Sequence, residues 1–171
     1  MEFSVAGCVV ALLIFAPTLV LLVAPPRGGG LPVSGAGPIV VLLERSGQAA
    51  CLALLVFSGA TLSLPPVDGW LVVAVVAILA YWTLWLRYLI TRDAWSLFAP
   101  FARVPIPMAL LPVVAFAAAA GWARSPWLLG ASVVLAAAHW TISWKSYALL
   151  RAERHASTGT LPSLRSPRTP R

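Results

Sequence analysis

The sequence predicts an all-α protein, a polytopic integral membrane helical bundle with about five transmembrane helices. Of its 171 residues, 60% are hydrophobic and only 10% are charged, whereas about one quarter of the residues in a soluble domain are charged. The apolar residues also form blocks long enough to cross the ~30 Å hydrocarbon core of a bilayer. None of these blocks alternates polar and apolar residues as a barrel strand does. Their backbone hydrogen bonds must therefore be satisfied within helices.

The expected spans are separated by clusters of proline, glycine, serine or charged residues. They cover residues 5–24, 48–64, 70–90, 104–122 and 127–147. Tryptophan or tyrosine stands near several of their ends, which is typical of side chains at the headgroup level. Residues 1–150 are expected to form one transmembrane helical domain. Residues 151–171 have no apolar period and are rich in Ser, Thr, Pro and Arg, so we expect a disordered basic tail on the cytoplasmic side.

The first span is interpreted as an uncleaved anchor. No Lys or Arg precedes it, and Leu22 stands where a signal-peptide cleavage site needs a small residue.

The second span is short for a crossing, and an alternative start at Pro38 would lengthen it, because proline is well tolerated in the first turn of a helix. On such a helix Glu44, Gln48, Cys51 and Ser58 share one face. We expect this polar face to point into the bundle.

The third span carries Tyr81, Trp85 and Tyr88 on one face and Arg87 near its inner end. Arginine at that depth can extend its charged group to water, so Arg87 is interpreted first as a topological anchor. The sharper hypothesis is an ion pair between Arg87 and Glu44, and the two interpretations are compatible.

The fourth span begins with three prolines. Pro105 and Pro107 predict an extended start and Pro112 a kink. Farther along, Ala117 and Gly121 are small residues at a spacing that lets helices approach closely. This face could serve packing within the chain or dimerisation.

The fifth span carries a polar face made of Ser132, His139, Ser143 and Ser146, flanked by aromatic residues. Together with the second and third spans, it suggests a polar cavity with an aromatic lining. The candidate polar residues are Glu44, Gln48, Arg87, His139 and Ser143, and the candidate aromatic residues are Tyr81, Trp85, Tyr88, Trp140 and Trp144. In the alternative interpretation, the hydroxyls bond to their own helices and the aromatic rings fill space or anchor at the interface.

His139 is the main candidate functional residue, because an ionisable group near the middle of a span is costly. An interhelical hydrogen bond is its commonest role, and proton transfer is the alternative. Metal or haem ligation has little support. The other histidine is His155, and Cys8 and Cys51 are single residues without ligand spacing. No metal and no cofactor are therefore expected.

The distribution of basic residues predicts orientation. With the C-terminus inside, most arginines lie in loops 25–47 and 91–103 and in the tail, while the opposite face carries Arg124 alone. This predicts a multi-pass protein of the inner (plasma) membrane with the N-terminus outside and the C-terminus inside. The basic tail should contact anionic lipid headgroups. Topology already explains the net charge of +7, so nucleic acid is not expected as a partner. Many arginines beside one lysine suggest a bacterial source.

Three functional classes remain open. An accessory or structural protein that binds a membrane-protein partner or a second copy ranks first, because none of the familiar enzyme motifs is present. The second is a transporter or carrier of a small molecule or ion, with a cavity lined by the second, third and fifth spans. The third is a membrane-embedded enzyme acting on a lipid or quinone, with His139 and Glu44 as its acid–base pair.

Overall fold

The computed structural model describes residues 2–27, 31, 34–57, 67–101 and 104–159. This part of the chain is all-helical, as predicted, with 81% of the described residues in helices. The elements are α1 (Val5–Phe15), η1 (Ala16–Leu19), α2 (Val20–Val23), α3 (Pro38–Val56), α4 (Gly69–Thr91), α5 (Trp95–Phe98), α6 (Pro107–Trp122) and α7 (Pro126–Gly159).

Four stretches are long and apolar enough to cross a membrane: Val5–Val23, α3, α4 and most of α7. The helix in the place of the fourth expected span, α6, has 16 residues and is shorter. It begins at Pro107 and not at Val104, because a residue before proline is pushed out of the helical region. Ile106, which precedes Pro107, has a φ of 48° and ends the irregular stretch.

The predicted second span, 48–64, was placed too late. The helix begins at Pro38 and ends at Val56, and residues 58–64 lie outside the described residues. Proline at the first helical position is favourable because its missing N–H would be unpaired there in any case. The charged residues Glu44 and Arg45, which suggested a loop, lie inside the helix.

The fifth span was predicted to end at Tyr147, and the disordered tail to begin at residue 151. Both predictions were wrong within the described residues, because α7 continues to Gly159. The segment from Ala148 to Arg154 consists mainly of Ala, Leu, Arg and Glu, which all favour helix. These propensities outweighed the basic, polar character of the segment.

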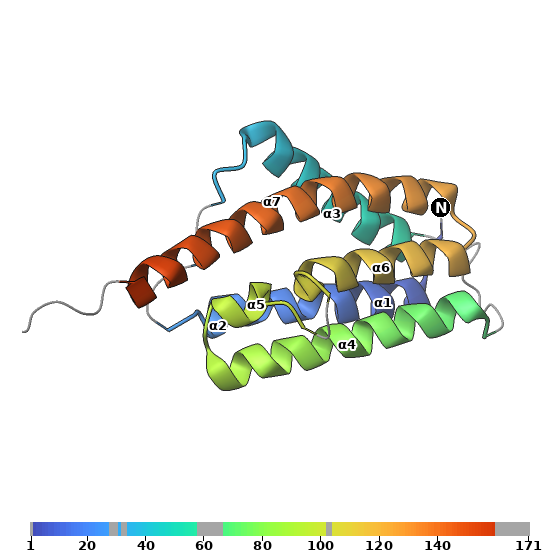
Figure 1. Ribbon diagram of the computed structural model, residues 1–171. Coiled ribbons are helices and arrows are strands. Elements are labelled where there is room, and N and C mark those ends of the chain that lie inside the picture. The colour runs from blue at the N-terminus through green and yellow to red at the C-terminus, as the bar shows by residue number, and fades with distance from the viewer. Residues whose placement is uncertain (1, 28–30, 32–33, 58–66, 102–103, 160–171) are drawn as a thin grey trace, which may run out of the picture.

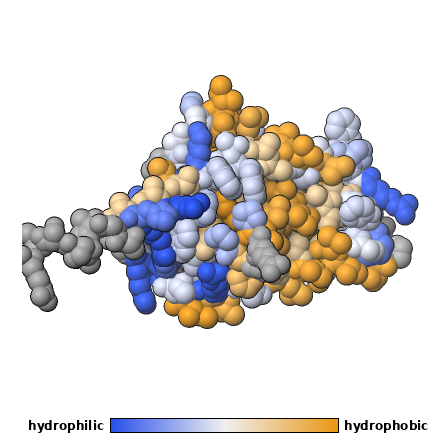
Figure 2. Space-filling model, in the orientation of Figure 1, coloured by the Kyte–Doolittle hydropathy of each residue, from blue (hydrophilic) through white to orange (hydrophobic). Residues whose placement is uncertain are grey.

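The helices alternate in direction along the chain, so α1, α4 and α7 run one way and α3 and α6 the other (Figure 1). We call the end where α4 and α7 finish the basic end. Figure 2 shows hydrophilic residues gathered at this end, while hydrophobic residues dominate the middle of the molecule. Arg124, in the connection between α6 and α7, lies at the opposite end, which we call the packed end.

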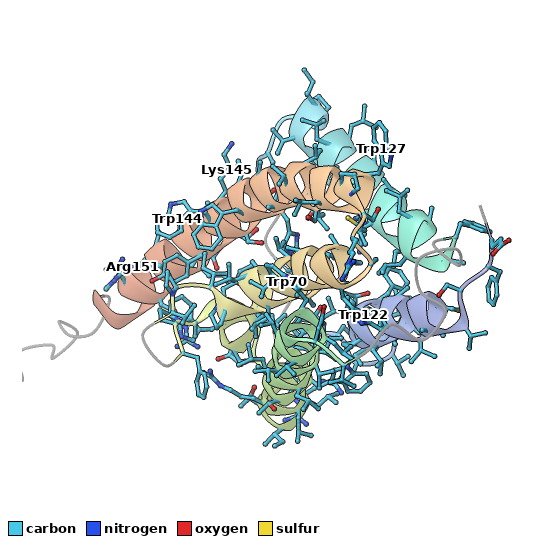
Figure 3. All side chains as sticks on the ribbon, turned by 90° about the vertical axis from the view of Figure 1, so that its right-hand side faces the viewer. Trp70, Trp122, Trp127, Trp144, Lys145 and Arg151 are labelled. Atoms are coloured by element: carbon cyan, nitrogen blue, oxygen red, sulfur yellow. The ribbon has the colours of Figure 1, made fainter. Side chains whose placement is uncertain are left out.

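The shortest of the apolar helices, α6, occupies the centre of the bundle. It packs against α4 on one side and α7 on the other, while α3 packs against α7 and α1. Seen along the bundle, α6 lies between α7, α4 and α1 (Figure 3). Its buried side chains include Ala115, Ala118, Ala119 and Ala120, and these small residues let the surrounding helices approach closely.

Two glycines mark the tightest contacts of the described chain. A Cβ on Gly47 would lie 3.0 Å from the backbone nitrogen of Leu135, so α3 and α7 cross almost backbone to backbone. A Cβ on Gly121 would lie 2.6 Å from the indole ring of Trp70. The small residue predicted at position 121 therefore accommodates an aromatic ring of α4.

One backbone carbonyl of α1 depends on a side chain of α4 for its hydrogen bond. Pro17 has no N–H to donate to the carbonyl of Leu13, and the helix tightens into η1 at this point. Trp82 Nε1 donates to that carbonyl over 2.9 Å. Farther along, the Tyr88 hydroxyl donates to the Ala24 carbonyl over 2.6 Å. The two bonds hold the α1–α2 stretch along α4.

Candidate functional site

A cavity of about 390 Å³ lies toward the basic end of the bundle. We call it the main cavity. Its walls come from η1, α2, α3, α4, α5, α6 and α7, while α1 contributes no lining residue. Most of the lining is apolar. A volume of this size and a lining of this kind are typical of small-molecule sites.

The polar centre of the main cavity is a contact between α3 and α7. His139 Nδ1 lies 2.6 Å from Glu44 Oε1, and the two side chains are 28% and 16% exposed. A carboxylate can only accept hydrogen bonds, so Nδ1 carries the proton and donates. The crossing at Gly47 and Leu135 creates this contact, because Glu44 and His139 each lie about one helical turn from it, on the side toward the basic end.

A second cavity, of about 60 Å³, lies on the other side of this contact. We call it the inner cavity. Glu44 and His139 line both cavities, while Gln48 and Pro112 line only the inner one. The pair therefore separates the main cavity from the apolar packing around Phe116 and Leu135.

Three polar side chains that line the main cavity make no hydrogen bond to another helix of the described chain. Trp85 is 5% exposed, and among the described residues its Nε1 interacts only with the Tyr81 hydroxyl of its own helix. Ser143 and Ser146 are 6% and 5% exposed, and neither hydroxyl makes a hydrogen bond to the described chain. Ser132, on the same helix but outside the cavity, donates to the carbonyl of Leu129 over 2.7 Å. Trp122 Nε1, at the far end of α6, is also unpaired within the described part of the chain, so the two serines are the hydroxyls of α7 to which the cavity could supply a partner.

The basic end of the main cavity is covered by α5, whose Leu97 and Phe98 contribute to the lining. Asp93 Oδ1 accepts from the backbone N–H of Trp95 over 3.0 Å, and Asp93 Oδ2 binds Arg154 of α7 at 2.5 Å. The Trp95 ring stacks on Tyr147 with centroids 5.5 Å apart. These contacts fasten α5 to the extended end of α7.

The structure brings together several of the residues that the sequence singled out. Glu44, His139, Ser143, Tyr81 and Trp85 all line the main cavity, and Gln48 lines the inner cavity. They come from three helices, as the sequence suggested. The pair named in the enzyme hypothesis, His139 and Glu44, is in direct contact.

Other predicted residues lie elsewhere. The predicted Arg87–Glu44 ion pair is wrong, because Glu44 bonds to His139 and the Arg87 guanidinium lies 5.6 Å from the Phe101 ring centroid. Tyr88 is fully buried and donates to Ala24. Trp140 and Trp144 stack on each other with centroids 6.0 Å apart, on the exposed side of α7.

Comparisons of the chain with family models, curated proteins and solved structures gave no match. The described residues contain no group of three or more His, Cys, Asp or Glu side chains that could hold a metal ion.

The sequence did not indicate the part of the lining that precedes α6. Ile106 and Met108 line the main cavity, and α5 adds Leu97 and Phe98. The proline pattern predicted an irregular start for this helix, yet periodicity carries no information about where an irregular segment folds. The backbone carbonyl of Met108 also lacks its usual donor, because Pro112 has no N–H.

The polar side chains of the main cavity can bind both hydrogen-bond donors and hydrogen-bond acceptors of a ligand. Glu44 holds the imidazole ring of His139 in place through Nδ1, which leaves Nε2 for a ligand. Trp85 and the two serines can donate to an oxygen atom of a ligand. The contact between carboxylate and imidazole can also carry a proton, so the site is chemically capable of acid–base work.

Proposed function

We propose that the protein is a multi-pass integral membrane protein of the inner (plasma) membrane, with five spans, the N-terminus outside and the basic end inside. Four long apolar helices and the alternating directions of all five main helices support this. At ~1.5 Å per residue, α6 is only ~24 Å long. The chain before it would complete the crossing, since irregular backbone is tolerated at membrane depth where protein buries it.

We further propose that the protein binds a small molecule in the main cavity, as a transporter or carrier does. The Glu44–His139 contact carries this proposal, because it places two ionisable side chains in the wall of a cavity whose lining is mostly apolar. Ionisable groups within spans are costly and mark substrate or ion pathways. The polar face of α3 and the polar face of α7 meet at this contact.

Cysteine labelling tests whether the cavity admits a small molecule. Cys8 and Cys51 are first replaced by Ala, and Ser146→Cys and Ser132→Cys are then compared in lipid nanodiscs with N-ethylmaleimide. Both serines are buried on α7, but only Ser146 lines the main cavity. Thiol reactivity follows access, so we expect Ser146→Cys to react about tenfold faster. Equally slow reaction at both positions would refute small-molecule binding in the cavity.

A second function, binding of a membrane partner, is favoured by a different surface. An apolar groove of about 340 Å³ runs between α6 and α7 on the outside of the bundle. It is lined by Ala109, Leu110, Val113, Ala136, Ala137 and Trp140. Small residues of this kind allow close packing of a further helix.

Crosslinking tests whether a second copy fills this groove. Ala137→Cys, in the same cysteine-free background, should crosslink between copies in membranes, whereas Val133→Cys, which is also exposed on α7, should not. No crosslink at either position would exclude the homodimer through this groove.

A further inference from the structure

We infer that the ligand of the main cavity is a neutral amphiphile whose polar head carries a hydroxyl group, and that this hydroxyl donates to His139 Nε2. The inference rests on the proposed small-molecule function and adds the chemical class of the ligand.

The charges around the main cavity argue for a neutral ligand. Its ionisable lining consists of Glu44, His139, Arg45 and the phenol of Tyr81. The carboxylate of Glu44 is already matched by His139 at 2.6 Å, so an incoming cation would have to displace the imidazole. Arg45, exposed on α3, repels a cation on its way in. An incoming anion would be repelled by the Glu44 carboxylate, which lies beside His139, the half-buried basic group of the lining.

The bond between Glu44 and His139 decides what the imidazole can offer. With Nδ1 donating to the carboxylate, a ring that carries a single proton presents Nε2 as an acceptor, and our inference assigns this form to His139. No described residue donates to Nε2. The complementary ligand group is therefore a hydroxyl, which brings its own proton to the cavity.

The unpaired hydrogen-bond donors of the lining indicate that the ligand carries a second oxygen atom. Trp85 is 5% exposed, and among the described residues its Nε1 has only the Tyr81 hydroxyl of its own helix as a neighbouring polar group, without a hydrogen bond to another helix. Ser143 and Ser146 lie on the α7 face that also carries His139. Buried donors without partners cost free energy, and an oxygen atom bound beside the hydroxyl would remove that cost. A hydroxyl oxygen can itself accept from one of these donors.

The rest of the lining suits an apolar body. Leu21, Leu97, Phe98, Met108 and Ile142 surround the polar centre. In the proposed membrane placement, these side chains face a cavity within the lipid-embedded part of the bundle. A ligand with one polar head and a hydrocarbon body matches this division between one polar wall and several apolar ones.

Four compounds with one ring and one tail test the inference: 4-octylphenol, its methyl ether, 4-octylbenzylammonium and 4-octylbenzoate. The readout is protection of Ser146→Cys from N-ethylmaleimide in nanodiscs, with Cys8 and Cys51 replaced by Ala. The phenol should slow labelling at about tenfold lower concentration than its methyl ether, which lacks the donor, because one hydrogen bond of this kind gives a difference of that order. The cation and the anion should be weaker than the phenol.

Two controls separate cavity binding from other effects. Ala148→Cys lies on the exposed face of α7 outside the main cavity, so no compound should protect it. His139→Leu should abolish the preference for phenol over methyl ether. If this variant fails to fold, the preference for the phenol over its methyl ether, measured with His139 intact, still tests the inference.

The outcomes distinguish the inference from the function on which it rests. Equal protection by phenol and ether, stronger protection by the cation or the anion, or no protection by any compound would each overturn the neutral hydroxyl class. In all three cases fast labelling of Ser146→Cys would leave the cavity accessible and the proposed function standing. Slow labelling of Ser146→Cys without any compound would refute both.

Discussion

The packed end and the basic end of this bundle are built from the same helices in opposite ways. Around the packed end, α3, α6 and α7 meet through glycine and alanine, and the apolar cluster includes Cys51, Ala115, Ala119 and Leu128. Toward the basic end, the same helices separate around a cavity of about 390 Å³. The difference teaches that residue size sets the helix separation, and that polar residues occupy the space that results.

Serines on α7 show the same contrast. Ser132, in the packed region, satisfies its hydroxyl with the carbonyl of its own helix. Ser143 and Ser146 leave theirs unpaired in the cavity. Serine therefore has two different roles on α7. Where helices are in contact, serine acts as a small packing residue, and where they separate, it becomes part of a polar wall.

The largest expected effect comes from filling the close approach between the backbones of α3 and α7. Gly47→Val would push side-chain carbons into the Leu135 backbone, which lies 3.0 to 3.2 Å from an added Cβ. We expect a loss of about 3 kcal/mol in the free energy of unfolding, because over-packing against a backbone cannot relax cheaply. Unfolding of the detergent-solubilised protein by SDS measures the loss.

Gly130→Val is the matched control, since an added Cβ at Gly130 meets nothing within 4 Å. If the two valine variants lose equal stability, close approach at Gly47 does not hold the packed end together.

The next largest effect is expected at the boundary between the two ends. His139→Leu leaves the partly buried carboxylate of Glu44 without its partner. Removing one member of a fully buried pair costs several kcal/mol, and the partial exposure of both groups reduces this to about 1–2 kcal/mol. SDS unfolding of a double-mutant cycle with Glu44→Gln should reveal coupling between the two positions.

Arg87 provides the control for this cycle. Its guanidinium lies over the Phe101 ring and not near Glu44, so losses from Arg87→Ala and Glu44→Gln should be additive within about 0.5 kcal/mol. Coupling between Arg87 and Glu44 would support the ion pair predicted from the sequence and contradict the contacts seen in the structure.

A smaller effect is expected for the bond that holds α1 along α4. Trp82→Phe keeps the ring but removes the donor to the Leu13 carbonyl. The expected loss is about 0.6 kcal/mol, the average for interhelical hydrogen bonds in membranes. Faster amide hydrogen exchange confined to α1 and η1 would show that the lost contact is this one, and unchanged exchange there would contradict it.

The smallest effect on overall stability is expected at α5. Asp93 and Arg154 are about half exposed, at 48% and 52%, and exposed ion pairs contribute about 0–1 kcal/mol. Arg154→Ala should therefore hardly change unfolding. It should nevertheless loosen the cover of the cavity, seen as faster N-ethylmaleimide labelling of Ser146→Cys, and an unchanged rate would show that α5 does not limit access.

The sequence was sufficient to predict the helices and most of the polar wall, and the reasons are physical. Long apolar blocks must be helical in lipid, and the spacing of Ser132, His139 and Ser143 places them on one face of any helix. The partner of Glu44 could not be obtained in this way. Depth along a helix made Arg87 a candidate, but the partner is set by which faces meet, and that depends on the crossing at Gly47.

The ends of α3 and α7 show a second limit of sequence reasoning. Charge near Glu44 and from Arg151 onward suggested boundaries, yet the segment around Glu44 and the described residues 151–159 are helical. In each case a tertiary contact matches the charge, through His139 for Glu44 and through Asp93 for Arg154. Such contacts join residues far apart in the chain and leave no local pattern.

The bond from Trp82 to the Leu13 carbonyl also bears on how the chain assembles during synthesis. Pro17 deprives that carbonyl of its usual donor, and the donor that replaces it lies 69 residues later in the chain. If α1 entered lipid alone, the carbonyl would meet hydrocarbon without a partner. The α1–η1 stretch is thus completed only after α4 has been synthesised, so in the proposed membrane placement α1 would remain near the insertion machinery, or in contact with water, until α4 arrives.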